Sequence, residues 1–152
     1  MGALIPLEEA QDYVLGRCEG PASAVVPLAD ARGLVLAESV ESPEHVPPFA
    51  NTAMDGFAVR AADTVGAPVT LDLVGTVAAG VDPVAGGIGV GPGGAVRIMT
   101  GAPMPPGADA VVKVELAEAS SDGTTVRVDV EVPVGNHVRA AGEDLVAGDN
   151  CF

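Results

Sequence analysis

The sequence predicts a mainly β protein of the α+β class, with one helix at its N-terminus. Its 20 glycines and 13 prolines are spread along 152 residues, which favours many short strands joined by tight turns. Several stretches alternate apolar and polar residues, the pattern of a half-buried strand. The apolar fraction of 48% supports a packed core, and the aromatic fraction of 3% means that valine, leucine and alanine must build it.

The predicted helix starts at Pro6. Proline is favoured at the first helical position, and Glu8 and Glu9 place acidic side chains in the first turn, where the helix dipole favours them. Glycines at 16 and 20 mark its end. The apolar residues that share one face of this helix are Leu7, Ala10, Val14 and Leu15. Beyond the helix we expect a short strand at Ala24–Leu28 and a helical turn at Asp30–Gly33.

The remaining elements are predicted from alternation and turn signals. A hairpin is expected at Asp122-Gly123, because the segments on either side of it, Ala110–Leu116 and Thr124–Val132, both alternate. The glycine-rich stretch Ala78–Gly94 is expected to form loops with little helix. The other expected strands are Phe57–Val59, Val69–Val77, Ala95–Met99 and His137–Arg139.

The charge balance excludes several kinds of partner. The formal net charge is −14 with a single lysine, Lys113, so the surface repels phosphate backbones and anionic membranes. We therefore expect no nucleic acid and no membrane as partners. Acidic residues stand where a signal peptide needs a basic and then an apolar run, and no stretch approaches the ~20 apolar residues of a membrane span. The predicted location is the cytoplasm.

One loop has the composition of a binding site. Between Pro47 and Arg60 the chain holds three short polar side chains, Asn51, Thr52 and Asp55, on a segment stiffened by two prolines and flanked by two phenylalanines. The other interpretation of these residues is an ordinary Asx turn that leads into a strand.

Three motifs together resemble a known family. They read S-P-E-H-V-P-P-F-A-N-T-A-M-D-G-F-A-V (Ser42–Val59), V-R-I-M-T-G-A-P-M-P-P-G-A-D-A-V-V (Val96–Val112) and V-R-A-A-G-E-D (Val138–Asp144). In this order and spacing they resemble the N-terminal region of molybdopterin molybdenumtransferase, the MoeA type that includes the gephyrin E domain. The resemblance covers nearly the whole chain, and the first two motifs are long and specific.

The resemblance implies a fold and a function. The fold would contain coiled or bifurcated β-sheets with a β-barrel-like subdomain. The family transfers molybdenum from molybdate to adenylated molybdopterin with Mg²⁺, the last step of molybdenum cofactor synthesis. The resemblance implies an elongated homodimer. Its active cleft would lie between the N-terminal β subdomain of one subunit and the pterin-binding part of the other. Molybdopterin adenylyltransferase is a further partner that the resemblance allows.

The resemblance also implies site residues. Asp55 of the M-D-G motif and Thr100 of the M-T-G motif match positions that are important for activity. A carboxylate repels molybdate, so we expect Asp55 to hold Mg²⁺, while Thr100 and Gly101 offer a hydroxyl and a turn N–H to an oxyanion. Asn51, Thr52 and Arg97 are further candidate cofactor-binding residues, although strict alternation turns Arg97 and Thr100 to opposite faces. Glu143 and Asp144 match the family's acidic turn, or simply cap a surface turn.

The domain organisation follows from two Pro- and Gly-rich hinges. We expect a helix-containing linker subdomain made of residues 1–45 and 138–152, and a β subdomain of residues 46–137. The pterin-binding and C-terminal domains of the family are absent from the sequence, so the chain by itself is expected to be inactive. Two interpretations stay open: the N-terminal part of a molybdenum insertase, or a truncated binding or dimerisation module without catalysis.

Overall fold

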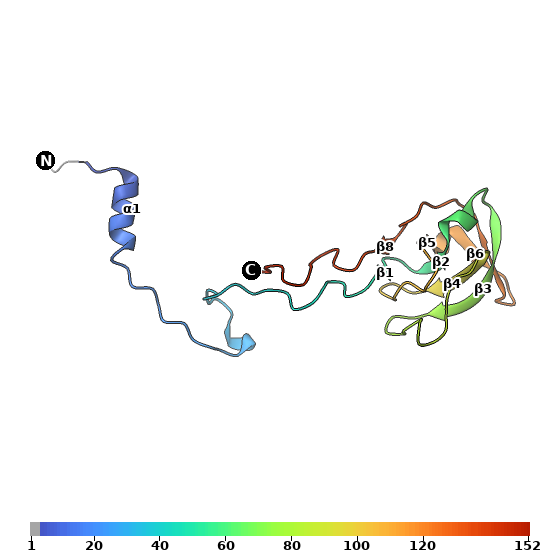
Figure 1. Cartoon of the computed structure of the whole chain (residues 1–152), viewed down its shortest axis with the longest axis horizontal. Coiled ribbons are helices and arrows are strands. Elements are labelled where there is room, and N and C mark those ends of the chain that lie inside the picture. Colours follow the sequence, from blue (N-terminus) through green and yellow to red (C-terminus); the bar gives the residue numbers. More distant parts are fainter. Residues whose placement is uncertain (1–3) are drawn as a thin grey trace. The chain divides into compact units, whose positions relative to one another are not determined.

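The computed structural model describes residues 4–152, and its backbone contacts divide the chain into two units, Met1–Ser39 and Val40–Phe152. In the first unit the predicted helix is present as α1 (Leu7–Leu15), and a 3-10 turn, η1, covers Leu28–Asp30 (Figure 1). The strand expected at Ala24–Leu28 is wrong. Its backbone pairs with no strand among residues 4–152, and an isolated extended segment leaves the ladder groups of a strand without partners.

The second unit is built on a curled, half-barrel sheet of six strands, which confirms the mainly β fold class (Figure 1). The strand order is β5-β2-β4-β3-β7-β6, and every neighbouring pair is antiparallel except β3 and β4. Two 3-10 turns, η2 (Ala61–Thr64) and η3 (Val114–Leu116), connect strands. The strands are β2 (Gly56–Val59), β3 (Val69–Val77), β4 (Gly94–Ile98), β5 (Ala110–Lys113), β6 (Ala117–Ala119) and β7 (Thr125–Val128).

The hairpin at Asp122-Gly123 is present, but one of its strands was predicted wrongly. The partner of β7 across this turn is β6, whereas β5 pairs with β2 on the far edge of the sheet. The 3-10 turn η3 interrupts the alternating segment that begins at Ala110. It redirects the chain, so that one continuous apolar pattern supplies strands to both edges of the sheet.

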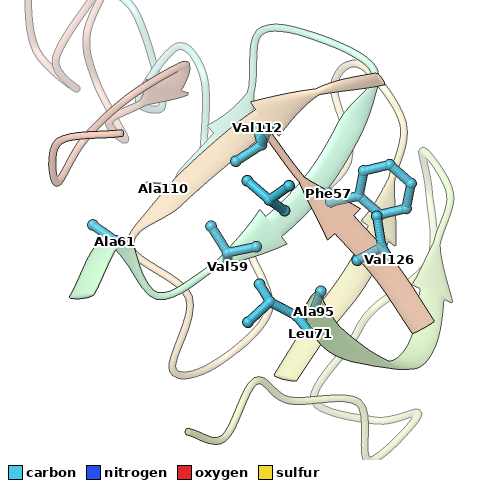
Figure 2. Packing of buried hydrophobic residues seen from close by; sticks show 9 residues of the cluster. Phe57, Val59, Ala61, Leu71, Ala95, Ala110, Val112 and Val126 are labelled. Carbon is cyan, nitrogen blue, oxygen red and sulfur yellow. The ribbon is translucent and has the colours of Figure 1, made fainter. Parts of the chain in front are cut away.

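Alternation along the strands divides the core between the two faces of the sheet. On the concave face Phe57 packs with a cluster of small apolar side chains (Figure 2). Ala58, the next residue along β2, belongs to a second cluster on the opposite face, together with Val96 and Ile98. Successive side chains of a strand point to opposite faces, so both faces of the central strands are buried. The other members of the concave cluster are Val59, Ala61, Leu71, Ala95, Ala110, Val112, Val126 and Val128.

A second, smaller sheet joins two segments that are far apart in the sequence. Here β1 (Asn51–Thr52) pairs with β8 (Val138–Arg139) in antiparallel register. Isolated bridges continue this pairing from Glu41 to Asn150 and from Val46 to Leu145, so the two segments run side by side (Figure 1). The predicted division into residues 1–45 plus 138–152 and 46–137 stays a prediction.

Two further features bear on the expected surroundings of the protein. Cys18 and Cys151 are both free thiols. Among residues 4–152, no helix has the length and the apolar character that crossing a membrane requires.

Candidate functional site

The two residues that match the family's activity motifs are in direct contact. The Oδ1 atom of Asp55 accepts a hydrogen bond of 2.7 Å from the backbone N–H of Thr100, and another of 2.7 Å from its hydroxyl. Both residues are exposed to solvent. The M-D-G and M-T-G motifs, 45 residues apart in the sequence, therefore form one polar site.

The pairing of β2 and β4 brings these residues together. Asp55 immediately precedes β2, and Thr100 follows β4 by two residues. The two strands are antiparallel, and Gly56 lies opposite Ile98. The start of one strand and the end of the other therefore lie at the same edge of the sheet. Gly101 then turns the chain with a φ of +79°, a conformation that glycine adopts without strain.

The surroundings of Asp55 favour its ionised form. The backbone N–H of Thr100 has the largest effect in lowering the pKa of Asp55, followed by the Thr100 hydroxyl, and the positive charge of Arg97 adds a smaller contribution. Burial of the carboxyl acts in the opposite direction. Because hydrogen bonds donated to a carboxylate stabilise its charge, Asp55 presents an anion at neutral pH.

Two donors that we expected to face an oxyanion are occupied by protein groups. The hydroxyl of Thr100 donates to Asp55 at 2.7 Å, and the N–H of Gly101 donates to the carbonyl of Thr52 at 2.9 Å. The Thr52 side chain is also engaged, because its hydroxyl bonds to the backbone of Met54 and the residue is only 1% exposed. The site therefore presents a carboxylate and a hydroxyl oxygen rather than a cradle of N–H groups.

Asn51 and Arg97, two further predicted site residues, differ in their surroundings. Asn51 is 8% exposed, and its side chain makes no hydrogen bond to residues 4–152. The Arg97 guanidinium stacks over the Phe57 ring, 5.3 Å from its centroid, and forms no ion pair with the described residues. It is near enough to lower the pKa of Asp55 but does not hydrogen-bond to it.

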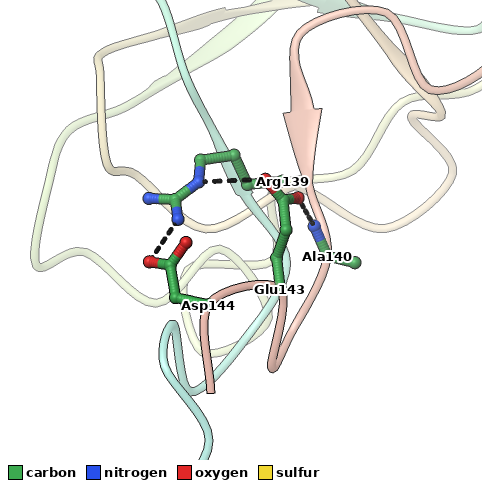
Figure 3. Close-up of polar contacts among 4 residues, drawn as sticks. All are labelled: Arg139, Ala140, Glu143 and Asp144. Atoms are coloured by element: carbon green, nitrogen blue, oxygen red, sulfur yellow. Dashed lines mark hydrogen bonds and ion pairs between the residues drawn. The ribbon is translucent and has the colours of Figure 1, made fainter. Parts of the chain in front are cut away.

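The third motif contributes β8, the strand that pairs with β1. In β8, Arg139 lies opposite Asn51 of β1. Its guanidinium pairs with Glu143 at 3.5 Å and with Asp144 at 2.5 Å, and Glu143 also accepts the N–H of Ala140 (Figure 3). Asp144 and then Glu143 raise the pKa of Arg139. This ion-pair cluster was not predicted from the sequence, although the separations of four and five residues within one turn were a usable signal.

The structure describes no complete metal site. Among residues 4–152 no group of three or more histidine, cysteine, aspartate or glutamate side chains is placed to hold an ion. Asp55 nevertheless fits the role of a single carboxylate ligand, because its Oδ1 is held by Thr100 while the hydrogen bonds of the described residues leave Oδ2 unused. Mg²⁺ commonly binds through one or two carboxylates and completes its shell with water and substrate phosphates.

Comparison with known proteins places the chain in a family. The family model described as the MoeA N-terminal region (domain I and II) matches residues 5–152. The chain belongs to the MoeA family. The described fold agrees with this, since a crystal structure of the molybdopterin biosynthesis MoeA protein from Pyrococcus horikoshii OT3 superposes with a TM-score of 0.84. That match has 32% sequence identity and covers 99% of this chain and 40% of the Pyrococcus chain.

Curated MoeA relatives show how much of the family's length this chain represents. Molybdopterin molybdenumtransferase 2 of Mycobacterium tuberculosis (strain H37Rv) is 41% identical over 146 residues, which cover 93% of this chain and 35% of the relative. Molybdopterin molybdenumtransferase of Bacillus subtilis (strain 168) is 36% identical over 150 residues, which cover 95% of this chain and 34% of the relative. The chain thus spans about a third of the length of these curated MoeA relatives.

Proposed function

We propose that this chain is the N-terminal part of a molybdenum insertase, which transfers molybdenum from molybdate to adenylated molybdopterin in molybdenum cofactor biosynthesis. The chain supplies one wall of an active cleft, and a pterin-binding domain completes this cleft. The observation that carries this proposal is the contact between Asp55 and Thr100, because it joins two family motifs into one exposed polar site. The 152-residue region by itself is expected to be inactive.

The charge of Asp55 determines which ligand it serves. Molybdate, the substrate, is a dianion, and an ionised carboxylate repels it. Asp55 therefore holds a cation, and Mg²⁺ is the hard, oxygen-seeking ion that suits its unused Oδ2. When bound, Mg²⁺ supplies positive charge that neutralises phosphate and oxyanion charge.

Thr100 provides the uncharged part of the site. Its hydroxyl donates a hydrogen bond to Asp55, so the oxygen lone pairs face away from that carboxylate and can accept a hydrogen bond from a ligand. The Asn51 amide and the Arg97 guanidinium are the candidate donors to the anionic substrate, since both lack hydrogen-bonded or ionic partners among residues 4–152. Thr52 and Gly101 contribute through their backbones, because the carbonyl of Thr52 accepts the N–H of Gly101 beside Thr100.

One observation favours a second function as a binding or dimerisation module. The apolar face of α1 is exposed, and none of its described residues is buried. Leu7, Val14 and Leu15 each expose more than half of their surface, which is unusual for an amphipathic helix in a folded protein. We propose that in a homodimeric enzyme these side chains pack against other parts of the protein. Molybdopterin adenylyltransferase is a further candidate partner.

A domain graft tests the proposed function. Residues 5–152 replace the matching region of the Bacillus subtilis molybdenumtransferase. The resulting chimeric enzyme is assayed for conversion of adenylated molybdopterin and molybdate into molybdenum cofactor. We expect activity in the graft, and a loss of at least about a hundredfold for Asp55→Asn, because the cation loses its carboxylate.

The matched control for this test is Asp122→Asn. Asp122 is also an exposed loop carboxylate held by hydroxyl and N–H donors, but it lies at the β6–β7 turn. Its substitution is expected to leave activity within about twofold, as is usual for a surface position outside a site. A folded graft that is inactive before any substitution would favour the binding-module interpretation.

A further inference from the structure

Thr52 contacts both of the loops that carry the site. It lies in β1, opposite Val138 of β8, and it is 1% exposed. Its side chain bonds to the loop that leads to Asp55, and its backbone bonds to the loop that contains Thr100. The pairing of β2 and β4 brings Asp55 and Thr100 to the same edge of the sheet, and beyond the ends of these strands their separation also depends on what holds the two loops.

The contact with the Asp55 loop is made by the hydroxyl. The Thr52 Oγ1 donates to the carbonyl of Met54 at 2.7 Å and accepts the N–H of Met54 at 3.1 Å. These bonds close a tight turn over residues 52–54, immediately before Asp55. The closed turn fixes the direction of the backbone as it enters Asp55. Without the hydroxyl, the polar groups of Met54 lose their partner in a part-buried environment.

The contact with the Thr100 loop is made by the main chain. The N–H of Thr52 donates to the carbonyl of Ala102 at 3.1 Å, and the carbonyl of Thr52 accepts the N–H of Gly101 at 2.9 Å. Both bonds lie within two residues of Thr100. A shift of the Thr52 backbone therefore moves the loop that carries Thr100 as well as the turn that carries Asp55.

We propose that Thr52 is a positioning residue, which sets the distance between Asp55 and Thr100 by holding both loops at once. It does not contact the ligand, because its hydroxyl is buried and already occupied by Met54. The inference rests on the proposed function only for what Asp55 and Thr100 do to a substrate. The geometric part can be tested in the 152-residue chain without any ligand.

The test compares Thr52→Val and Thr52→Ser with a control at Thr64. Valine has the shape of threonine without the hydroxyl, and serine keeps the hydroxyl. Thr64 is equally buried, and its Oγ1 likewise donates to a carbonyl (Ala61, 2.8 Å) and accepts an N–H (Val132, 3.0 Å), but it lies in η2. Thr64→Val therefore removes the same kind of hydroxyl from a place with no bond to either loop.

The measurement is amide hydrogen exchange and amide chemical shift by NMR, residue by residue. In Thr52→Val we expect the amides of Thr100 and Gly101 to exchange about tenfold faster, and the Thr100 amide resonance to move upfield as its bond to Asp55 lengthens. Amides of the central strands should change no more than they do in Thr64→Val. Thr52→Ser should keep the Thr100 and Gly101 amides close to their original behaviour.

Each outcome bears on the proposal. It is overturned if Thr100 and Gly101 respond no more to Thr52→Val than to Thr64→Val, or if a folded Thr52→Ser loses the Thr100 shift despite its hydroxyl. Should Thr52→Val fail to fold, Thr52→Ser still decides. In the graft, Thr52→Val should lower kcat while Thr52→Ser restores it. Normal activity in a variant with a displaced Thr100 amide would count against the proposed function and not against the positioning role.

Discussion

The carboxylate of Asp55 and the side chain of Thr100 meet at the edge of the sheet where β2 begins and β4 ends, with both Thr100 donors 2.7 Å from the same oxygen. One carboxylate oxygen is thus fully engaged, while the other is free of bonds to residues 4–152. This arrangement fixes the orientation of the carboxylate without neutralising its charge.

The first prediction concerns the pH dependence of the contact. The folded protein lowers the pKa of Asp55, so the stabilising effect of its ionised form is present above the ordinary pKa of about 3.9 and is lost as the pH falls through the folded value. An NMR titration of the side-chain carboxyl carbons should show Asp55 titrating below the ordinary range. Asp122 serves as an internal reference, because the Ser120 hydroxyl and the donors of Thr124 lower its pKa to about 2.

Substitution of Thr100 separates the two donors. Thr100→Val removes the hydroxyl and keeps the backbone N–H, which has the larger effect on the pKa of Asp55. The pKa should therefore rise only part of the way toward its ordinary value. Ser120→Ala should raise the pKa of Asp122 and leave Asp55 unchanged. If Thr100→Val leaves the pKa of Asp55 unchanged, the hydrogen bond from the Thr100 hydroxyl is absent in solution.

The second prediction concerns Gly56, which starts β2 beside the site. A Cβ at this position would lie 2.0 Å from the backbone oxygen of Val112, so Gly56→Ala must push β2 and β5 apart. We expect a loss of about 3 kcal/mol or more in the free energy of unfolding, measured by urea denaturation. Gly66→Ala is the control, because a Cβ there meets no atom within 4 Å and only its φ of +78° is unfavourable, at about 1 kcal/mol. Equal losses for the two variants would contradict this explanation.

The third prediction concerns His137, the non-glycine residue with a positive φ, +54°, among residues 4–152. Its carbonyl accepts the N–H of Ala53, so its left-handed backbone aligns the connection to β8 with the Asp55 loop. His137→Val should cost about 1–2 kcal/mol, since a β-branched residue is strained in this conformation. His137→Asn should change stability by less than about 0.5 kcal/mol, because asparagine tolerates it. Thermal or urea unfolding of the two variants decides, and a tolerated valine would show that the backbone relaxes.

The fourth prediction concerns the exposed face of α1. Changing Val14 and Leu15 together to glutamine should alter the free energy of unfolding by less than about 0.5 kcal/mol, because neither side chain is buried. The same pair of changes should reduce self-association, which sedimentation velocity measures. Glu8→Gln and Glu9→Gln, in the same helix, form the matched control. If the apolar pair changes stability strongly and association not at all, the face packs within the chain instead.

The sequence by itself determined the mainly β class, the helix at Leu7–Leu15 and the strand Val69–Val77, since period and turn chemistry depend on neighbours along the chain. It also predicted a strand in Thr124–Val132, of which the structure forms Thr125–Val128. The family motifs also pointed to Asp55 and Thr100. Only the tertiary structure decided which strands pair: η3 interrupts the alternating segment so that β6 becomes the partner of β7, and the segment at Ala24–Leu28 has no partner strand among residues 4–152. It also decided that the N–H groups of Thr100 and Gly101 bond to protein atoms. Hydrogen-bond partners distant in sequence are chosen by packing, which no local pattern encodes.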